Sequence, residues 1–101
     1  MSEQAILRMA QGSSGPSVNR LAIFLIAAGY DIENTIKSDG EFTPNGMIAW
    51  AVKRLQAAHN LPQTGDVDEA TAAAISEQYA DLLARVPPAS KWLGEDNLVA
   101  P

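Results

Sequence analysis

The sequence predicts an all-α fold: a compact three-helix core with an internal pseudo-repeat, long loops and flanking terminal segments. Three segments place apolar residues at steps of three and four, which is the spacing of one face of a helix. Residues that commonly begin or end helices stand at the borders of these segments. In addition, one series of motifs occurs twice along the chain, which indicates a repeated structural unit.

The first helix is expected to begin at Pro16 and to end before Gly29. Proline suits the first helical position, where no amide donor is needed, and glycine readily adopts the left-handed conformation that ends a helix. The apolar face consists of Val18, Leu21, Ala22, Leu25 and Ala28, widened by Ile23, Phe24 and Ile26. We therefore expect this helix to be the most buried of the three.

The second helix is expected to begin at Thr43-Pro44, a cap followed by a first-turn proline. Its apolar stripe consists of Ile48, Ala51, Val52, Leu55 and Ala58. It is expected to end near Asn60, because asparagine tolerates the left-handed conformation and Pro62 prevents continuation.

The third helix is expected to begin after Asp68, whose side chain suits a helix cap, and to stop before Pro87. Its inner side is formed by Thr71, Ile75, Tyr79, Leu82 and Val86.

The pattern divides the chain into an N-terminal extension (1–11), a helical domain (12–86) and a C-terminal tail or linker (87–101). Residues 2–9 of the extension, which begin with Ser2-Glu3-Gln4 and include Ile6, Leu7 and Met9, are expected to form a short, frayed helical turn. The tail carries the apolar residues Trp92, Leu93, Leu98 and Val99. It either packs on the domain or leads away as a linker, and we favour packing because an exposed Trp-Leu pair is adhesive.

The pseudo-repeat begins with Val18-Asn19-Arg20-Leu21, which resembles Val52-Lys53-Arg54-Leu55, 34 positions later. Each copy is followed by a glycine turn with one apolar residue, Asp39-Gly40-Glu41-Phe42 in the first and Thr64-Gly65-Asp66-Val67 in the second. Each turn leads into the next helix. The two copies therefore share the middle helix, which predicts a pseudo-symmetric core.

The composition excludes several classes of partner. The formal net charge is −5, and the seven Lys and Arg residues are dispersed, whereas nucleic-acid binding needs clustered basic residues. The longest apolar run, residues 21–28, is too short to insert across a membrane. No secretory signal is evident. We expect a cell-wall location if a parent protein, phage lysis or a secretion system delivers the chain, and a cytoplasmic location otherwise.

No catalytic residues, metal ligands or cofactors are expected. The chain has no cysteine and one histidine, His59, whereas zinc sites and catalytic triads require several partners. Asp39, Asp66 and Asp68 stand where turns and helix caps usually place aspartate. We therefore predict that the protein is not an enzyme.

The ordered motifs resemble the peptidoglycan-binding domain family, small helical modules of bacterial and phage wall hydrolases. The family pattern is matched in order by G-S-S-G-P-S-V (12–18), G-Y (29–30), D-G-E-F (39–42), A-V-K-R-L-Q (51–56) and the spaced residues Leu61, Gly65, Val67, Thr71 and Ile75. The resemblance implies a helical fold and non-catalytic binding to peptidoglycan.

Trp50 is the leading candidate for a ligand contact, because it lies off the apolar stripe of its helix, beside Lys53 and Arg54. Its ring suits stacking on a sugar while the two cations meet stem-peptide carboxylates. Alternatively, Trp50 is covered by the terminal segments. Tyr30 and Gln56 are further candidates, although loop packing and bonding to a loop backbone explain them more simply.

Asp39 also belongs to the candidate set, through the D-G-E-F motif that resembles the family's, although local bonds to the turn are its favoured role.

Two functions follow from these observations. The first is a module that binds peptidoglycan, as glycan or stem peptide, and targets an associated wall-active protein. The alternative is a protein–protein interaction module, an adaptor of a phage or secretion assembly with the same fold. The acidic charge favours the alternative, because bacterial walls are often negatively charged and give a −5 domain no long-range attraction.

Overall fold

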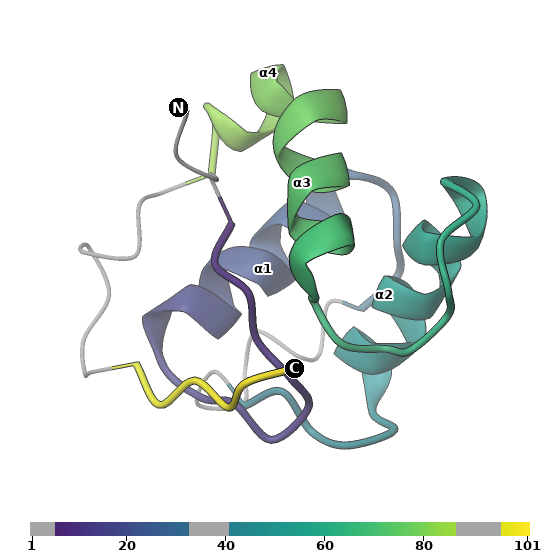
Figure 1. Cartoon of the computed structure of the whole chain (residues 1–101). Coiled ribbons are helices and arrows are strands. Elements are labelled where there is room, and N and C mark those ends of the chain that lie inside the picture. The colour runs from purple at the N-terminus through teal and green to yellow at the C-terminus, as the bar shows by residue number, and fades with distance from the viewer. Residues whose placement is uncertain (1–5, 33–40, 87–95) are drawn as a thin grey trace.

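The computed structural model describes residues 6–32, 41–86 and 96–101. The described residues form four helices: α1 (Pro16–Ala27), α2 (Met47–Ala58), α3 (Glu69–Gln78) and the short α4 (Ala80–Leu83) (Figure 1). Extended segments in this part of the chain form only isolated bridges, and no strand is present among them. The predicted all-α fold is confirmed. None of the described helices is long and apolar enough to cross a membrane.

Helix α1 begins and ends as its sequence predicts. Pro16 is at its start, and Gly29, with φ 104°, follows its last turn. Gly15, the residue before the helix, has no side chain to cap it. The C-terminal segment provides the cap instead, because the Asp96 carboxylate accepts bonds from Ser17 N at 2.8 Å and Ser17 Oγ at 2.9 Å.

Helix α2 begins three residues later than predicted, at Met47, so the expected cap at Thr43 is wrong. Gly46 N donates to Thr43 O at 2.9 Å, and Asn45 has φ 57°. The segment is therefore a tight turn that reverses the chain before the helix starts. The predicted end is confirmed, since α2 stops at Ala58 and Asn60 has φ 58°.

The predicted third helix is divided in two. Asp68 caps α3 as expected, accepting a bond from Thr71 N at 2.9 Å. Helical geometry is then interrupted at Tyr79 (φ −123°, ψ 28°). The Tyr79 ring packs edge-on against Phe24 with centroids 5.3 Å apart, and its hydroxyl lies 3.0 Å from His59 Nε2. These contacts anchor Tyr79 to α1 and to the end of α2, and the chain turns there into α4.

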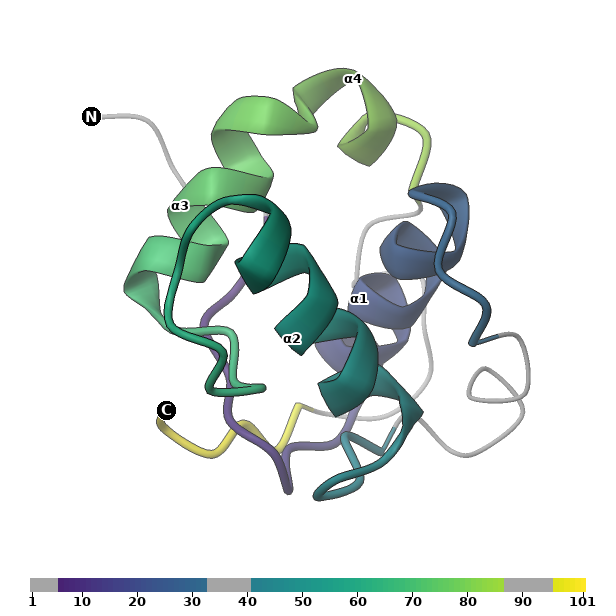
Figure 2. The same cartoon turned by 90° about the vertical axis from the view of Figure 1, so that its right-hand side faces the viewer.

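The core lies where α1, α2 and α3 meet, and Figure 2 shows α2 in front with α3 and α1 on either side. Its largest fully buried residues are Ile6, Met9, Leu21, Phe24, Leu25, Ile32, Phe42, Ile48, Leu55 and Ile75. Two of these, Ile6 and Met9, come from the N-terminal segment. The residues that the sequence sets apart as an extension thus contribute to the same core.

Residues 6–14 form no helix, and a turn at residues 11–12 separates two extended stretches, so the predicted helical turn over residues 2–9 is wrong in its described part, residues 6–9. Met9 exchanges two backbone bonds with Val67, at 2.9 and 2.7 Å, while Phe42 N donates to Ser13 O at 2.8 Å. This one segment therefore pairs with the apolar residue of both repeat turns. Phe42 and Val67 are both fully buried, which explains why each glycine turn of the pseudo-repeat carries one apolar side chain.

The C-terminal residues 96–101 lie along the other edge of this segment (Figure 1). Ser14 and Asn97 exchange backbone bonds of 2.9 and 2.7 Å, and Ala10 N donates to Val99 O at 2.8 Å. This part of the tail is thus attached to the domain. Trp92 and Leu93, the residues on which the expectation of packing rested, lie outside the described residues.

Candidate functional site

The outer face of α2 carries an exposed tryptophan beside a basic residue. Ile48, Ala51 and Leu55 face the core and are buried. Trp50 and Arg54 therefore project on the other side, and 43 % of Trp50 is exposed. Residues four positions apart are neighbours on a helix, and the guanidinium carbon of Arg54 lies over the Trp50 ring, 5.2 Å from its centroid.

The contact between Arg54 and the Trp50 ring is a cation–π interaction. Such contacts at exposed sites stabilise by about 0.5–1 kcal/mol. Arg54 covers one face of the Trp50 ring, and the ring remains substantially exposed to solvent. The Trp50 ring therefore presents apolar surface to solvent beside a positive charge.

Tyr30 comes to this face from the loop that follows α1. Gly29 reverses the chain, and Tyr30 N then donates to Leu25 O at 3.0 Å. Burial of its ring raises the pKa of Tyr30, as does the neighbouring Tyr79, while the positive charge of Arg54 acts in the opposite direction. The Tyr30 hydroxyl therefore stays protonated, and able to donate a hydrogen bond, throughout the neutral range.

Tyr30 and Arg54 line a shallow hollow of about 340 Å³ together with Ala57, Ala58 and Gln63. The two alanines are exposed residues of the last turn of α2, and Gln63 lies in the loop beyond it. We call the set Tyr30, Trp50, Arg54 and Gln63 the α2 surface. Sequence reasoning missed Gln63, because a polar residue after Pro62 in a loop carries no recognisable pattern.

The structure does not bring Lys53 to the hollow. Lys53 is half-buried, and its Cε lies near Gly65, where an added Cβ would be 3.0 Å away. Its side chain therefore passes along the turn between α2 and α3, on a different side of the helix from the hollow.

Gln56 is not available to a ligand, and its place among the candidate contacts is corrected. Its side chain is fully buried. Its Nε2 lies 2.9–3.0 Å from Thr64 Oγ1, Asp66 O and Thr71 Oγ1, and its Oε1 accepts a bond from Gly65 N at 3.0 Å. Both ends of the Gln56 amide are thus bonded, to the turn before α3 and to Thr71 in α3 itself.

Asp39, the remaining candidate, lies outside the described residues.

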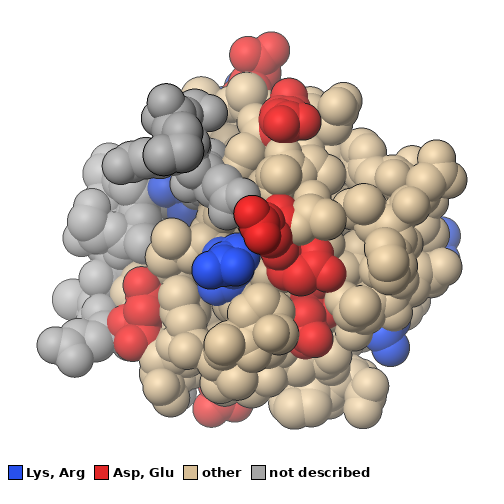
Figure 3. Space-filling model, viewed as in Figure 1, with Lys and Arg blue, Asp and Glu red and all other residues tan. Residues whose placement is uncertain are grey.

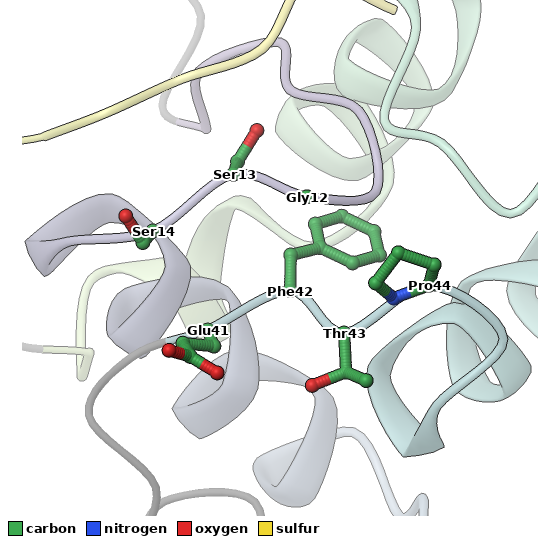
Figure 4. A pocket seen from close by; sticks show the side chains of 7 residues that line it. All are labelled: Gly12, Ser13, Ser14, Glu41, Phe42, Thr43 and Pro44. Atoms are coloured by element: carbon green, nitrogen blue, oxygen red, sulfur yellow. The ribbon is translucent and has the colours of Figure 1, made fainter.

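A second hollow of about 290 Å³ lies between the N-terminal segment and the turn before α2 (Figure 4). Ser14, Glu41 and Thr43 contribute polar side chains, and Pro44 contributes an apolar surface. Its aromatic residue, Phe42, is fully buried and offers no ring face to a ligand. We therefore regard the α2 surface as the stronger candidate.

The charge distribution also distinguishes α2. In the view of Figure 3, acidic side chains predominate at the centre of the face, and basic side chains appear at the right-hand edge, where α2 lies in Figure 1. Lys53 and Arg54 are the basic residues of α2, and this helix has no acidic residue. A chain with net charge −5 thus presents a locally positive helix.

The described residues contain no group of three or more His, Asp or Glu side chains placed to hold a metal ion. His59 is bonded to Tyr79 and packs against its ring, with centroids 5.6 Å apart. These contacts give His59 a role in joining α2 to the α3–α4 junction.

The family model described as "Putative peptidoglycan binding domain" matches residues 14–75, which is more than half of the chain. Searches of curated proteins and of solved structures found no match. The matched region contains Tyr30, Trp50, Arg54 and Gln63, and the N-terminal and C-terminal segments lie outside it. The order of motifs, the helical fold and this match agree, and the chain belongs to the peptidoglycan-binding domain family.

Proposed function

We propose that this domain is a non-catalytic module that attaches to bacterial peptidoglycan through the α2 surface and targets an associated wall-active protein. Membership of the family supports peptidoglycan as the partner. The observation that carries the proposed site is the pair of Trp50 and Arg54, an exposed aromatic ring beside a cation.

The chemistry of the α2 surface suits a polymer of sugars and peptides. Sugar rings have apolar C–H faces that pack on an aromatic ring, while their hydroxyls remain in water. Trp50 provides such a ring, and Arg54 and Tyr30 add hydrogen-bond donors beside it. The surface is shallow, so single contacts are weak. Many copies of the ligand on one polymer, or a tether to an enzyme, raise the effective concentration.

A non-catalytic role is supported by how the titratable side chains are used. His59 is bonded to Tyr79, and Asp68 caps α3. Asp66 accepts a bond from Gln11 N at 2.9 Å, and Asp96 caps α1. These groups stabilise the fold, and none of them lines the hollow beside α2.

Co-sedimentation with insoluble peptidoglycan tests the proposal. Wild type, Trp50→Ala and Leu7→Ala are compared at low salt. Leu7 is a matched control, because it is 49 % exposed and lies on the N-terminal segment. We expect wild type and Leu7→Ala to sediment equally and Trp50→Ala to remain mainly in the supernatant. Equal sedimentation of all three proteins would remove Trp50 from the site, and failure of the folded wild type to sediment would refute wall binding.

The second candidate function is an adaptor that binds another protein through the same helix. One observation favours it: Met47 is 48 % exposed and lies one turn before Trp50, so the two form an exposed apolar pair. Such pairs often mark protein interfaces. A Met47→Ala variant distinguishes the functions, since sugar stacking on Trp50 does not need Met47, whereas a protein interface loses buried apolar area.

A further inference from the structure

The hollow beside α2 has an unusual lining for so acidic a chain. Its described lining residues are Tyr30, Arg54, Ala57, Ala58 and Gln63, and none of these is a carboxylate. Three of them carry hydrogen-bond donors: a phenol, a guanidinium and a primary amide. The hollow therefore presents donors and a positive charge to any ligand that enters it.

The Arg54 guanidinium is exposed and lies over the Trp50 ring, and among the described residues no carboxylate forms an ion pair with it. The contact is made with the guanidinium carbon 5.2 Å from the ring centroid, and a guanidinium carries five N–H donors. Those donors match the two oxygens of a carboxylate in a bidentate arrangement.

Tyr30 and Gln63 line the same hollow and also carry hydrogen-bond donors. The Tyr30 hydroxyl is protonated at neutral pH, since the ordinary pKa of tyrosine is 10.0 and burial and the neighbouring Tyr79 raise the pKa of Tyr30 further. Gln63 is exposed and contributes an amide N–H₂. Ala57 and Ala58 provide small apolar surfaces that leave room for the end of a peptide. The volume, about 340 Å³, is at the small end of ligand sites.

We propose that this hollow is a carboxylate subsite, which takes a free carboxylate of a stem peptide while Trp50 packs on the neighbouring sugar. This assignment rests on the proposed function. A stem peptide is favoured over glycan as the occupant because sugar hydroxyls carry no charge to match Arg54. The four residues of the α2 surface thus divide into an aromatic contact for glycan and a polar contact for peptide.

The test uses peptidoglycan freed of phosphate polymers by acid treatment, so that carboxylates are its principal anions. Half of the material is then amidated chemically, which replaces each carboxylate by a neutral amide. We expect wild type to bind the amidated polymer about ten-fold more weakly, which corresponds to the loss of one charge-assisted interaction. Ionic strength is kept low and constant, because exposed charges are screened by salt.

Two variants connect the effect to the hollow. Arg54→Gln is expected to bind native polymer several-fold more weakly than wild type and to lose most of the discrimination between native and amidated polymer, because it removes the charge. Tyr30→Phe is expected to weaken binding to both polymers and to keep most of the discrimination, because a neutral phenol donates to carboxylate and amide alike. Arg85→Gln is the control, because Arg85 is exposed, follows α4 and carries the same charge. It is expected to keep full discrimination.

The outcomes separate this inference from the proposed function. Equal binding of wild type to both polymers would overturn the carboxylate subsite and leave peptidoglycan binding intact. Discrimination that persists in Arg54→Gln would overturn it as well. Binding that disappears when the phosphate polymers are removed would identify a phosphate ligand and refute the stem peptide. Failure to bind any form of the wall would refute the proposed function and the subsite together.

Discussion

Gln56 Nε2 donates to Thr71 Oγ1 at 2.9 Å, and both side chains are fully buried. This bond joins α2 to α3 through the interior. The same amide accepts from Gly65 N at 3.0 Å and lies 3.0 Å from Asp66 O. One side chain therefore holds the turn between two helices and the start of the second helix.

Replacing Gln56 by alanine is expected to destabilise the domain by roughly 3 kcal/mol. The substitution leaves buried donors and acceptors unpaired, each at a cost of about 1–3 kcal/mol, and also opens a cavity. Urea unfolding followed by circular dichroism measures the change. Gln78→Ala is the control, because Gln78 is exposed at the end of α3, and it is expected to change stability little. Equal stability of the two variants would show that the buried network contributes nothing.

Local rules predicted those parts of the fold that depend on neighbours in sequence. Gly29, Asn60 and Asp68 end or cap helices as their residue types predict. Contacts between distant segments were not predictable in this way. Asp96 caps α1 from 79 positions away, and no local pattern announces it. The helical spacing predicts Tyr79 on the inner side of the third helix. Its contacts with Phe24 and His59, which accompany the break between α3 and α4, arise only in the folded chain.

In the candidate site, too, some positions follow from neighbours in sequence and others depend on contacts between distant segments. Trp50 and Arg54 are four residues apart on one helix, so their proximity follows from helical geometry. Tyr30 reaches the hollow by way of the turn at Gly29, and Gln63 by way of the loop after α2. The position of these loop residues depends on tertiary packing. Gln56 remained ambiguous for the same reason, since Thr64 and Thr71 meet it only after α3 packs on α2.

Asp96→Ala is expected to loosen the C-terminal segment and to destabilise the domain by about 1 kcal/mol, the usual effect of removing a helix cap. The carboxylate that accepts two bonds from Ser17 is lost. Hydrogen exchange at Ala10 and Ser14 should accelerate, because their amides donate to residues 99 and 97. Glu77→Ala, at an exposed position of α3, serves as control. Unchanged exchange at both amides would show that the segment stays attached without the cap.

Gly65→Ala is expected to destabilise the domain more than Gly29→Ala. Both glycines have positive φ, 81° and 104°, where an L-residue is strained by about 1–2 kcal/mol. An added Cβ at Gly29 meets no atom within 4 Å, whereas at Gly65 it would lie 2.9 Å from Gln11 Nε2. The difference between the two variants in their free energy of unfolding, measured with urea, therefore reports the effect of crowding separately from that of backbone strain. Equal losses would mean that the Gln11 and Lys53 side chains, whose ends lie 2.9 and 3.0 Å from the added Cβ, move aside at no cost.

Stability is expected to fall above pH 10, partly because of Tyr30. Burial of the ring, and then the proximity of Tyr79, raise the pKa of Tyr30 in the folded chain above its ordinary value of 10.0. The unfolded chain therefore loses this proton first as pH increases. The stabilisation is fully present below pH 10 and is lost as pH rises through the folded pKa. Tyr30→Phe cannot ionise, so its unfolding free energy should decrease less steeply over this interval.

Urea unfolding at pH 8, 10 and 11 measures how steeply the unfolding free energies of wild type and Tyr30→Phe decrease with pH. Ultraviolet absorption of ionised tyrosine follows the titration directly. Arg54→Gln provides the matched comparison, because the Arg54 charge opposes the rise in the pKa of Tyr30. Removing that charge is expected to shift the Tyr30 titration to still higher pH and to steepen the loss of stability. Parallel pH profiles for wild type, Tyr30→Phe and Arg54→Gln would show that Tyr30 titrates as in the unfolded chain, and that Arg54 exerts no field on the hollow.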